Sequence, residues 1–322
     1  MSHPRAPDVS VVVSTRNRAS DVAELLAALP GQTLAPERFE VVVVNDGSTD
    51  GTQALLDEAT AGGKIAVRAI HRQSSNGPAV GRDEGWRVAR APLIAFTDDD
   101  CVPDPEWLER GLEAASANPG TFVQGRTAPR PDQLDQLGPW SRTMDVAELG
   151  PDFPATNLFY PRELLEALNG WDTDAFANAA GGEDTDLAWR AIESGARPVY
   201  EPRSLTFHAV THAGARGRLR VAARKTAVLP FARHRGARRN FVFGVFRKPV
   251  HLHLTLAAAG LLVPRRWRCF AIALAIPYLR SVRARGIVEG GGPRVWPFFV
   301  LHDLVEVYAT IAVAVKTRRL MI

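Results

Sequence analysis

Short apolar runs alternate with amphipathic segments in the N-terminal part of the chain, and this alternation constrains the fold more than any other feature. The runs cover Val9–Ser14, Phe39–Val44, Ile65–Ile70 and Leu93–Phe96, and turn residues bound them. Such runs are typical of buried parallel strands, while the segments between them carry apolar residues at helical spacing. The sequence therefore predicts an α/β fold with a Rossmann-like, mostly parallel sheet flanked by helices.

The remaining elements of this region follow from the same signals. Ser20 is of a residue type that caps helices, and we expect it to be the N-cap of the helix after the first strand. Beyond Asp104 we expect a helix over Leu108–Ala117, strands over Thr121–Gln124, Ala155–Tyr160 and Val199–Phe207, and a loop over Pro129–Gly138.

Polar side chains follow three of the predicted strands directly, in Thr15–Asn17, Asn45–Asp50 and Asp98–Asp100. Ligands of open α/β sheets bind at the carboxyl ends of strands. Three adjacent carboxylates repel one another unless a cation lies beside them, and hard oxygen ligands indicate Mg²⁺ or Mn²⁺. The alternative is a solvated acidic turn that caps the next helix. The chain has no G-x-G-x-x-G after the first strand and no Walker A sequence, which argues against a dinucleotide or a P-loop nucleotide.

The charge of the chain is divided unevenly along its length. Residues 1–215 contain 18 Lys and Arg against 32 Asp and Glu, a net charge of −14, whereas residues 216–322 contain 21 against 3, a net charge of +18. Two surfaces of opposite charge favour different partners, so we expect a domain boundary near residue 215. Two widely spaced cysteines fit a reducing compartment. The segment MSHPRAPDVS lacks an apolar core, so no signal peptide is expected.

Four segments resemble the successive motifs of family 2 glycosyltransferases, in the order and at the spacing of that family. They are VSVVVSTRNRASDVAELLAAL, FEVVVVNDGSTDGT, NGPAVGRDEGWRVARAPLIAFTDDDC and GGEDTDLAWR, and they run from Val9 to Arg190. The resemblance implies a GT-A fold with a nucleotide-binding part at about 1–101 and an acceptor-binding part at about 102–215. It also implies a nucleotide-diphosphate-sugar donor, with a UDP-sugar favoured.

The resemblance also assigns residues to the donor and to the metal. Thr15 and Asp46 would contact the base and ribose, and Arg82 would help to hold the nucleotide, although Arg82 could instead pair with a nearby carboxylate on the helix surface. The residues expected at the donor are Thr15, Arg16, Asn17, Asp46, Arg82, Asp98 and Asp99. The Asp98–Asp100 triplet is similar to the DXD motif of the family, in which Asp98 and Asp100 would bind Mg²⁺ or Mn²⁺. His208 directly follows the last strand and could complete the metal shell; a surface or core histidine is the alternative.

A second acidic stretch runs from Asn169 to Gly195. Glu183 and Asp184 follow two glycines and open a helix, where carboxylates could simply cap free N–H groups. In the resemblance this is the ED motif of the family, with Asp184 as general base. An ionised carboxylate is needed there because an acceptor hydroxyl is a poor nucleophile. Direct displacement would invert the anomeric configuration. Glu183 is expected beside Asp184 as the second catalytic residue, orienting the acceptor together with Asp172. Asp172 and Trp171 are expected to bind the acceptor, whose identity the sequence does not reveal.

The C-terminal region alternates clusters of arginine with the apolar stretches Leu252–Val263, Cys269–Leu279 and Trp296–Val315. The first two are shorter than the ~20 residues of a spanning helix. In the third, we expect His302, Asp303 and Glu306 on one side of a helix, and Phe299, Val300, Leu304, Val307 and Ile311 on the other.

This pattern predicts that residues 216–322 are basic amphipathic helices on an anionic membrane surface. The protein would then act in the cytoplasm, peripherally on the inner face of the plasma membrane. A helical cap or a homo-oligomer interface is the alternative. Arginines interleaved with aliphatic runs, rather than with stacking aromatics, argue against nucleic acid as a partner.

Two other functions stay open at this stage. A nucleotidyltransferase would also use strand-end carboxylates, a metal and a nucleotide, but it needs a lysine or a glycine-rich phosphate loop that Ser14–Asn17 does not offer. An inactive GT-A domain could serve as a basic membrane or nucleic-acid adaptor. The intact Asp98, Asp100 and Asp184 argue against that adaptor.

Overall fold

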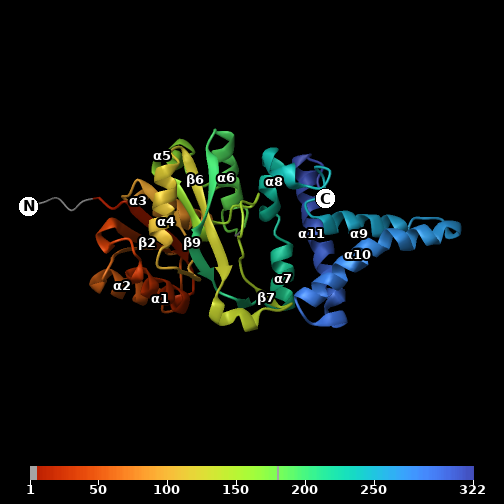
Figure 1. Ribbon diagram of the computed structural model, residues 1–322, viewed down its shortest axis with the longest axis horizontal. Coiled ribbons are helices and arrows are strands. Elements are labelled where there is room, and N and C mark those ends of the chain that lie inside the picture. Colours follow the sequence, from red (N-terminus) through yellow and green to blue (C-terminus); the bar gives the residue numbers. More distant parts are fainter. Residues whose placement is uncertain (1–5, 180) are drawn as a thin grey trace, which may run out of the picture. The chain divides into compact units, whose positions relative to one another are not determined.

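The computed structural model describes residues 6–179 and 181–322 (Figure 1). The chain forms two compact units. The sheet unit contains the residues up to Gln133 together with Thr143–Ala209, and the helical unit contains Leu134–Arg142 and Val210–Ile322. The functional boundaries predicted near residues 101 and 215 stay predictions.

An eight-stranded sheet forms the centre of the sheet unit. Its strand order is β3 (Ala66–His71), β2 (Phe39–Asn45), β1 (Val9–Thr15), β4 (Leu93–Phe96), β8 (Leu158–Pro161), β6 (Thr121–Pro129), β9 (Arg197–His208) and β5 (Cys101–Pro103). Strands β3, β2, β1 and β4 are parallel to one another, as the strand–helix alternation predicts. The sheet becomes mixed at β8, which is antiparallel to β4 and β6. Strand β9 is parallel to β6, and β5 is antiparallel to β9.

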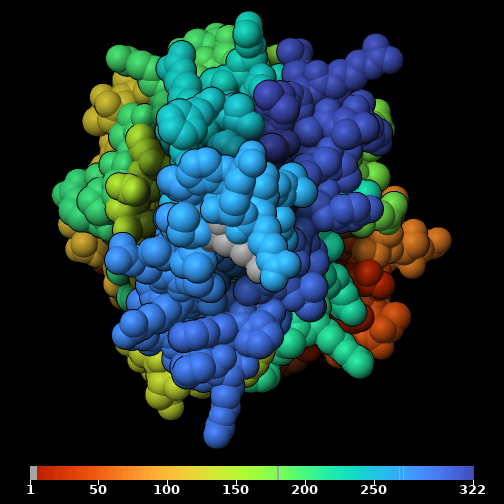
Figure 2. Space-filling view, turned by 90° about the vertical axis from the view of Figure 1, so that its right-hand side faces the viewer, coloured from red at the N-terminus to blue at the C-terminus, as the bar shows by residue number. Residues whose placement is uncertain are grey.

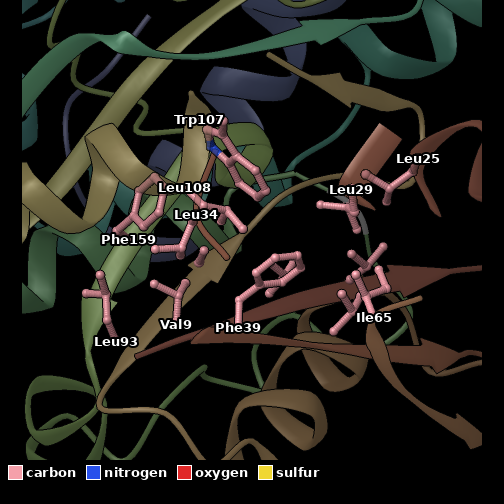
Figure 3. Packing of buried hydrophobic residues seen from close by; sticks show 14 of the residues in the cluster. Val9, Leu25, Leu29, Leu34, Phe39, Ile65, Leu93, Trp107, Leu108 and Phe159 are labelled. Carbon is pink, nitrogen blue, oxygen red and sulfur yellow. The ribbon is translucent and has the colours of Figure 1, made fainter. Parts of the chain in front are cut away.

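Hydrophobic clusters cover both faces of this sheet. Successive side chains of a strand point to opposite faces, so Val11 of β1 enters one cluster and Val12 enters the other. The first cluster, drawn in Figure 3, joins the sheet to α1 (Ala19–Ala28), α2 (Thr52–Gly62) and α4 (Trp107–Ala117). The second joins it to α3 (Pro78–Val88), α5 (Arg162–Ala167) and α6 (Glu183–Glu193). Each large apolar side chain buried in this way contributes ~1.5–3 kcal/mol.

Helix α3 lies very close to strand β1 because two of its glycines face the strand. A Cβ atom on Gly81 would lie 2.2 Å from Ser14 Oγ, and one on Gly85 would lie 2.6 Å from Val12 Cγ1. Any larger side chain would push the helix away from the sheet. The close packing fixes the position of Arg82, which follows Gly81 and is only 6% exposed.

Three local predictions for the sheet unit are wrong. Helix α1 begins at Ala19 without a side-chain cap from Ser20, because the loop after β2 and the first residue of α2 supply the acceptors. Arg18 N donates to Thr52 Oγ1, and Ala19 N donates to an Asp50 carboxylate oxygen. The predicted strand Ala155–Tyr160 starts with a 3-10 turn, η4 (Ala155–Asn157), and only then becomes β8. The loop predicted over Pro129–Gly138 contains a 3-10 helix, η3 (Pro131–Gln136).

The helical unit is built mainly from five helices and one short ribbon. They are β7 (Ser141–Arg142), β10 (Thr211–His212), α7 (Gly214–Ala222), α8 (Leu229–Arg233), α9 (Pro249–Gly260), α10 (Arg268–Val288) and α11 (Trp296–Thr317). Short 3-10 segments complete the two units: η1 (Leu29–Gly31), η2 (Pro36–Arg38), η5 (Thr226–Val228), η6 (Gly236–Asn240), η7 (Arg265–Trp267) and η8 (Gly292–Val295). Helices α9 and α10 pack side by side as a hairpin (Figure 1).

Helix α11 turns its charged side inward. Asp303 is fully buried and accepts hydrogen bonds from Arg285 and from Tyr278 Oη. Phe299 is also fully buried, one turn before Asp303. The prediction that Phe299 lies on the side opposite the charged residues is therefore wrong, since both side chains point to the same interior.

Candidate functional site

The loops after β1 and β2 are tied to one another at the carboxyl edge of the sheet. Asn17 has a positive φ of 53°, and its side-chain oxygen accepts a hydrogen bond of 2.7 Å from Thr49 N. In return, Asn17 N donates to Ser48 Oγ. Arg16 beside it is exposed, and Thr15 at the end of the strand is buried. These contacts position the loop; the donor-binding roles of Thr15, Arg16 and Asn17 stay predictions.

Asp46 organises the turn that precedes α3. Its carboxylate accepts hydrogen bonds from Ser75 Oγ at 2.7 Å, Asn76 N at 3.0 Å and Gly77 N at 2.9 Å, and Arg72 lies 3.2 Å away. A buried carboxylate with this many donors is held firmly in one orientation. Asp46 therefore has a structural role in the turn before α3, and its contact with a base or ribose stays a prediction.

Arg82 links the acidic triplet to the second acidic stretch. Its guanidinium donates to Asp98 Oδ1 at 2.5 Å and to Glu183 Oε1 at 3.1 Å, and it lies 5.4 Å from the centre of the Trp171 ring. The carboxylate pairing considered from the sequence is present, but it is buried and not on the helix surface. Burial opposes ionisation of Asp98, yet the neighbouring Arg82 charge outweighs it and lowers the pKa of that carboxyl.

The three predicted metal ligands come together. Oxygen atoms of Asp98 and Asp100 and a ring nitrogen of His208 lie within 4.8 Å of one another. The pairing of β5 with β9 places Cys101 opposite His208, which brings the triplet to the end of the last strand. His208 Nδ1 faces Ala209 O at 2.8 Å, while Nε2 lies 3.3 Å from Asp100 Oδ1. A neutral imidazole and two carboxylates form a donor set that suits Mn²⁺ or Mg²⁺.

Arg18 also belongs to this site, and the sequence analysis missed it. Its guanidinium lies 2.5 Å from Asp100 Oδ2 and 3.4 Å from Asp99 Oδ1. Burial raises the pKa of Asp99 to about 7, because ionising it would add a third negative charge to a poorly solvated triplet. Three adjacent carboxylates already require a counter-cation, and this was the signal that could have pointed to an arginine in the loop after β1.

The second acidic pair lies at the start of α6. Glu183 is buried, with Oε1 held by Arg82 and Oε2 accepting from Gly181 N at 2.6 Å. Asp184 does not cap its own helix, because Oδ2 accepts a hydrogen bond of 2.8 Å from Ala155 N. Burial, together with the neighbouring Glu183 charge, raises the pKa of Asp184 to about 7. A carboxyl with such a pKa can exchange a proton near neutral pH.

Trp171 and Asp172, both predicted at the acceptor, have structural contacts. Trp171 is buried, its backbone N–H donates to Asp83 Oδ1 at 3.0 Å, and its ring packs edge-on against Phe96. Asp172 Oδ1 accepts a hydrogen bond from Ala175 N. The Trp171 ring thus packs against the Arg82 guanidinium. The roles of Trp171, Asp172 and Glu183 at an acceptor stay predictions.

Comparison with known proteins now identifies the family. The family model described as glycosyl transferase family 2 matches residues 10–172, which is just over half of the chain. The chain belongs to glycosyl transferase family 2.

Among solved structures, it resembles a mannosyltransferase from Pyrobaculum calidifontis in complex with GDP-Man and Mn²⁺, with a TM-score of 0.62 and 23% identity, covering 98% of this chain and 88% of that one. It also resembles S. aureus TarS in complex with UDP-GlcNAc, with a TM-score of 0.54 and 15% identity over 97% and 92% of the two chains. These likenesses confirm the predicted GT-A fold.

Curated relatives in the family are similar over part of their length. The pre-mycofactocin glycosyltransferase of Mycobacterium tuberculosis (strain CDC 1551 / Oshkosh) is 28% identical over 226 residues, covering 65% of this chain and 45% of the relative. The polyprenol monophosphomannose synthase of Mycolicibacterium smegmatis is 32% identical over 184 residues, covering 52% of this chain and 67% of the relative. The chain spans about half the length of the first curated relatives it matches.

Proposed function

We propose that this family 2 member is an inverting glycosyltransferase that moves a sugar from a nucleotide-diphosphate-sugar to a hydroxyl acceptor. One observation carries the proposal: Arg82 joins the Asp98–Asp100–His208 cluster to the Glu183–Asp184 pair in one partly buried array. A glycosyltransferase needs positive charge beside the leaving diphosphate and a general base that deprotonates the acceptor hydroxyl. This array contains candidate residues for both roles. A UDP-sugar is the favoured donor, although the structural neighbours were solved with GDP-Man and with UDP-GlcNAc.

Asp98, Asp100 and His208 would hold a divalent cation, since their donor atoms suit Mn²⁺ or Mg²⁺. When bound, such an ion neutralises the charge that develops on the leaving diphosphate. The nearby guanidinium of Arg18 adds positive charge at the same place. Thr15, Arg16, Asn17, Asp46 and Asp99 are the further candidates for donor contacts.

Asp184 is the proposed general base. The hydrogen bond from Ala155 N holds one of its oxygens, and proton transfer requires only the other. Ionised Asp184 would take the acceptor proton as the acceptor oxygen bonds to the anomeric carbon and the bond to the diphosphate oxygen breaks. One displacement from the face opposite the leaving group inverts the configuration. A positioned base of this kind contributes roughly 10²–10⁴-fold to the rate.

A nucleotide-sugar hydrolysis assay tests this proposal. Purified protein is incubated with UDP-, GDP- and dTDP-sugars in the presence of Mn²⁺, Mg²⁺ or EDTA, next to Asp100→Ala and Asp184→Ala. We expect metal-dependent hydrolysis of one donor class that Asp100→Ala abolishes. Absence of both hydrolysis and metal-dependent nucleotide binding would reject the enzyme and leave the adaptor function.

We propose further that the enzyme works in the cytoplasm at the inner face of the plasma membrane, on a lipid-linked or cell-envelope glycan acceptor. Support comes from the net charge of +18 in residues 216–322. In the described residues, one helical segment, Gly292–Thr317, is by length and composition long and apolar enough to cross a membrane.

A further inference from the structure

Exposed apolar side chains are concentrated in the helical unit. Among the described residues, large hydrophobic side chains that are at least 40% exposed all belong to this unit, with the single exception of Leu149. Scattered exposed apolar residues are normal on a protein surface, but a concentration in one unit marks an interaction surface.

Helix α11 carries one part of this surface. Its acidic side chains lie inside among buried apolar residues, and its outer face is apolar. Its interior face holds the buried Phe299 and Asp303, together with Glu306, which accepts hydrogen bonds from Lys248. Its exposed side chains recur at intervals of three and four residues: Leu301, Leu304, Tyr308, Ile311 and Val315. At helical spacing these five side chains form one stripe along the whole helix. A soluble helix normally has the opposite arrangement.

The turn of the α9–α10 hairpin carries the other part, and Figure 2 looks onto this hairpin. Leu261 and Leu262, which follow α9, are 87% and 86% exposed. At the start of α10, Phe270 and Ile272 are both exposed although they point to opposite sides of the helix. In the middle of α10, Tyr278 is buried, as is Val282 one turn later. The base of the hairpin is therefore packed in the unit, and its turn exposes apolar side chains on more than one side.

Charge around the hairpin indicates the chemistry of the partner. Residues 249–288 contain six arginines and no aspartate or glutamate. Arg265 and Arg266 at the turn are exposed, as are Arg280 and Arg283 on α10. Arg283 follows Ile272 by eleven residues, about three helical turns, so its guanidinium and the Ile272 side chain lie on the same side of α10. Such a surface fits a layer that is apolar inside and anionic at its edge, and Trp267 at the turn suits the boundary between them.

The pattern on α11 argues against a second copy of the chain as the partner. Its exposed stripe has the spacing of a coiled-coil seam, but a two-stranded coiled coil normally has charged residues at the flanking positions, which set the pairing. Here the flanking positions are Val300, Val305, Val307 and Ala312. An apolar surface this wide, without charges at its sides, fits lipid better than a paired helix.

The helices are also poorly suited to cross a bilayer. Helix α9 has 12 residues and is about 18 Å long, well short of the ~30 Å apolar layer. Helix α11 is long enough, but the pairs of Asp303 with Arg285 and of Glu306 with Lys248 tie it to α10 and to the start of α9. Crossing would either break these pairs or carry four charged groups into the apolar layer.

We propose that the turn of the α9–α10 hairpin and the outer stripe of α11 insert into one face of an anionic bilayer without crossing it. This inference deepens the membrane location proposed above and names the residues that enter the lipid. The arginines hold the headgroup phosphates, and the leucine, isoleucine and phenylalanine side chains lie below them.

Vesicle co-sedimentation tests this inference. The full chain is mixed with phosphatidylcholine vesicles that either contain or lack phosphatidylglycerol. We expect binding to the anionic vesicles, weakened at least about tenfold in Leu261→Glu/Leu262→Glu and in Leu304→Glu/Ile311→Glu, since each change replaces inserted apolar area by charge. Leu149→Glu is the matched control, an exposed leucine of the sheet unit, and should bind as the wild type does. Arg265→Ser/Arg266→Ser should lose about fivefold per arginine on anionic vesicles only.

Two further measurements keep the outcomes distinct. Quenching of Trp267 fluorescence by brominated lipid, absent in Trp267→Phe, would report insertion of the turn even where a variant folds poorly. Equal binding of the wild type and both glutamate variants would overturn the inference. The wild type could instead fail to bind vesicles and form a dimer that Leu304→Glu/Ile311→Glu dissociates. That result would overturn the inference and assign the surface to a second copy of the chain. Donor hydrolysis should be unchanged in all these variants, so failure of the enzymatic proposal would be visible separately.

Discussion

Among the described residues, two clusters of histidine and carboxylate side chains could hold a metal ion, one in each unit, and they differ in how their charge is balanced. The clusters are Asp98, Asp100 and His208 in the sheet unit, and His302, Asp303 and Glu306 in the helical unit. In the cluster of the helical unit, each carboxylate has its own cation. Arg285 donates two hydrogen bonds to Asp303, and Lys248 donates to both oxygens of Glu306.

The sheet unit has more carboxylates than cations. The described site contains five of them, Asp98, Asp99, Asp100, Glu183 and Asp184, whereas the arginines paired with these groups are Arg18 and Arg82. Ligand atoms at suitable distances are thus common to both clusters, and the excess of negative charge is what distinguishes them. We infer that the first cluster requires a cation from outside, whereas the second is neutralised by the fold itself.

The largest effect should come from Asp184→Asn. The amide keeps the shape of the side chain and can still accept a hydrogen bond from Ala155 N, but it cannot take a proton. We expect sugar transfer to fall by roughly 10²–10⁴-fold, while metal-dependent binding of the nucleotide is unchanged. Transfer rates and nucleotide affinity, measured on the same preparation, check this. A parallel loss of both would make Asp184 part of the donor site instead of the base.

Asp100→Asn and Asp303→Asn separate the two clusters directly. Asp100→Asn should abolish Mn²⁺ binding and cost little stability, since it removes one of the excess charges. Asp303→Asn should leave Mn²⁺ binding unchanged and destabilise the fold by about 2–3 kcal/mol, because it leaves the partly buried Arg285 without its counter-ion. Urea unfolding and Mn²⁺ titration measure the two quantities, with the exposed Arg283→Gln as control. Mn²⁺ binding that depends on Asp303 would contradict the comparison.

The raised pKa of Asp184 makes the free energy of unfolding depend on pH, and the sign of that dependence follows from the direction of the pKa shift. An acid whose pKa is about 7 in the folded protein and ~3.9 when unfolded favours the folded state most at low pH. That contribution is lost as the pH rises from about 4 to about 7. In EDTA, the wild type and Asp184→Asn should therefore differ least near pH 4, and Asp184→Asn should become the more stable of the two at pH 8. Unfolding curves across this range check the sign; a constant difference would mean that Asp184 titrates normally.

The sequence predicted the parallel half of the sheet and the proximity of Asp98, Asp100 and His208 because both depend on local signals; that these three residues bind a metal stays a prediction. Apolar runs such as Val9–Ser14 indicate strands by themselves, and the carboxyl ends of parallel strands meet at one edge. His208 could be assigned because it follows the last strand. The turn at Ala155–Asn157 was predicted as strand because Asn157 forms hydrogen bonds that no local pattern reveals: its side chain contacts the backbone oxygens of Arg126 and Ser204.

Pairings between distant residues were the part that the sequence did not reveal. Arg82 was predicted to help to hold the nucleotide, with a surface carboxylate as the alternative partner. Its observed partners are Asp98 and Glu183, the latter 101 positions away, and its role at the nucleotide stays a prediction. Phe299 was placed on the wrong side of its helix, because hydrophobicity alone suggests that apolar residues lie opposite charged ones. In α11 the charged residues are inside, so the tertiary pairs decide the orientation. Arg18 was missed for the same reason, since its partner Asp100 is 82 positions away.

Arg18→Gln sharpens the comparison with the smallest expected effect. The Arg18 guanidinium pairs with Asp100 Oδ2, an atom that the proposed cation would also bind. In the absence of the nucleotide-sugar donor, the arginine and the ion therefore compete for this carboxylate. The pair is partly exposed and worth ~0.2–1 kcal/mol. Arg18→Gln should therefore bind Mn²⁺ up to about fivefold more tightly in the absence of nucleotide. It should bind a nucleoside diphosphate with Mn²⁺ more weakly than the wild type, because the variant lacks the positive charge that Arg18 would contribute beside the diphosphate. Arg38→Gln, another arginine paired with an aspartate but outside the site, should change neither affinity. Weaker Mn²⁺ binding by Arg18→Gln would show that the arginine supports the cation site and does not compete for it.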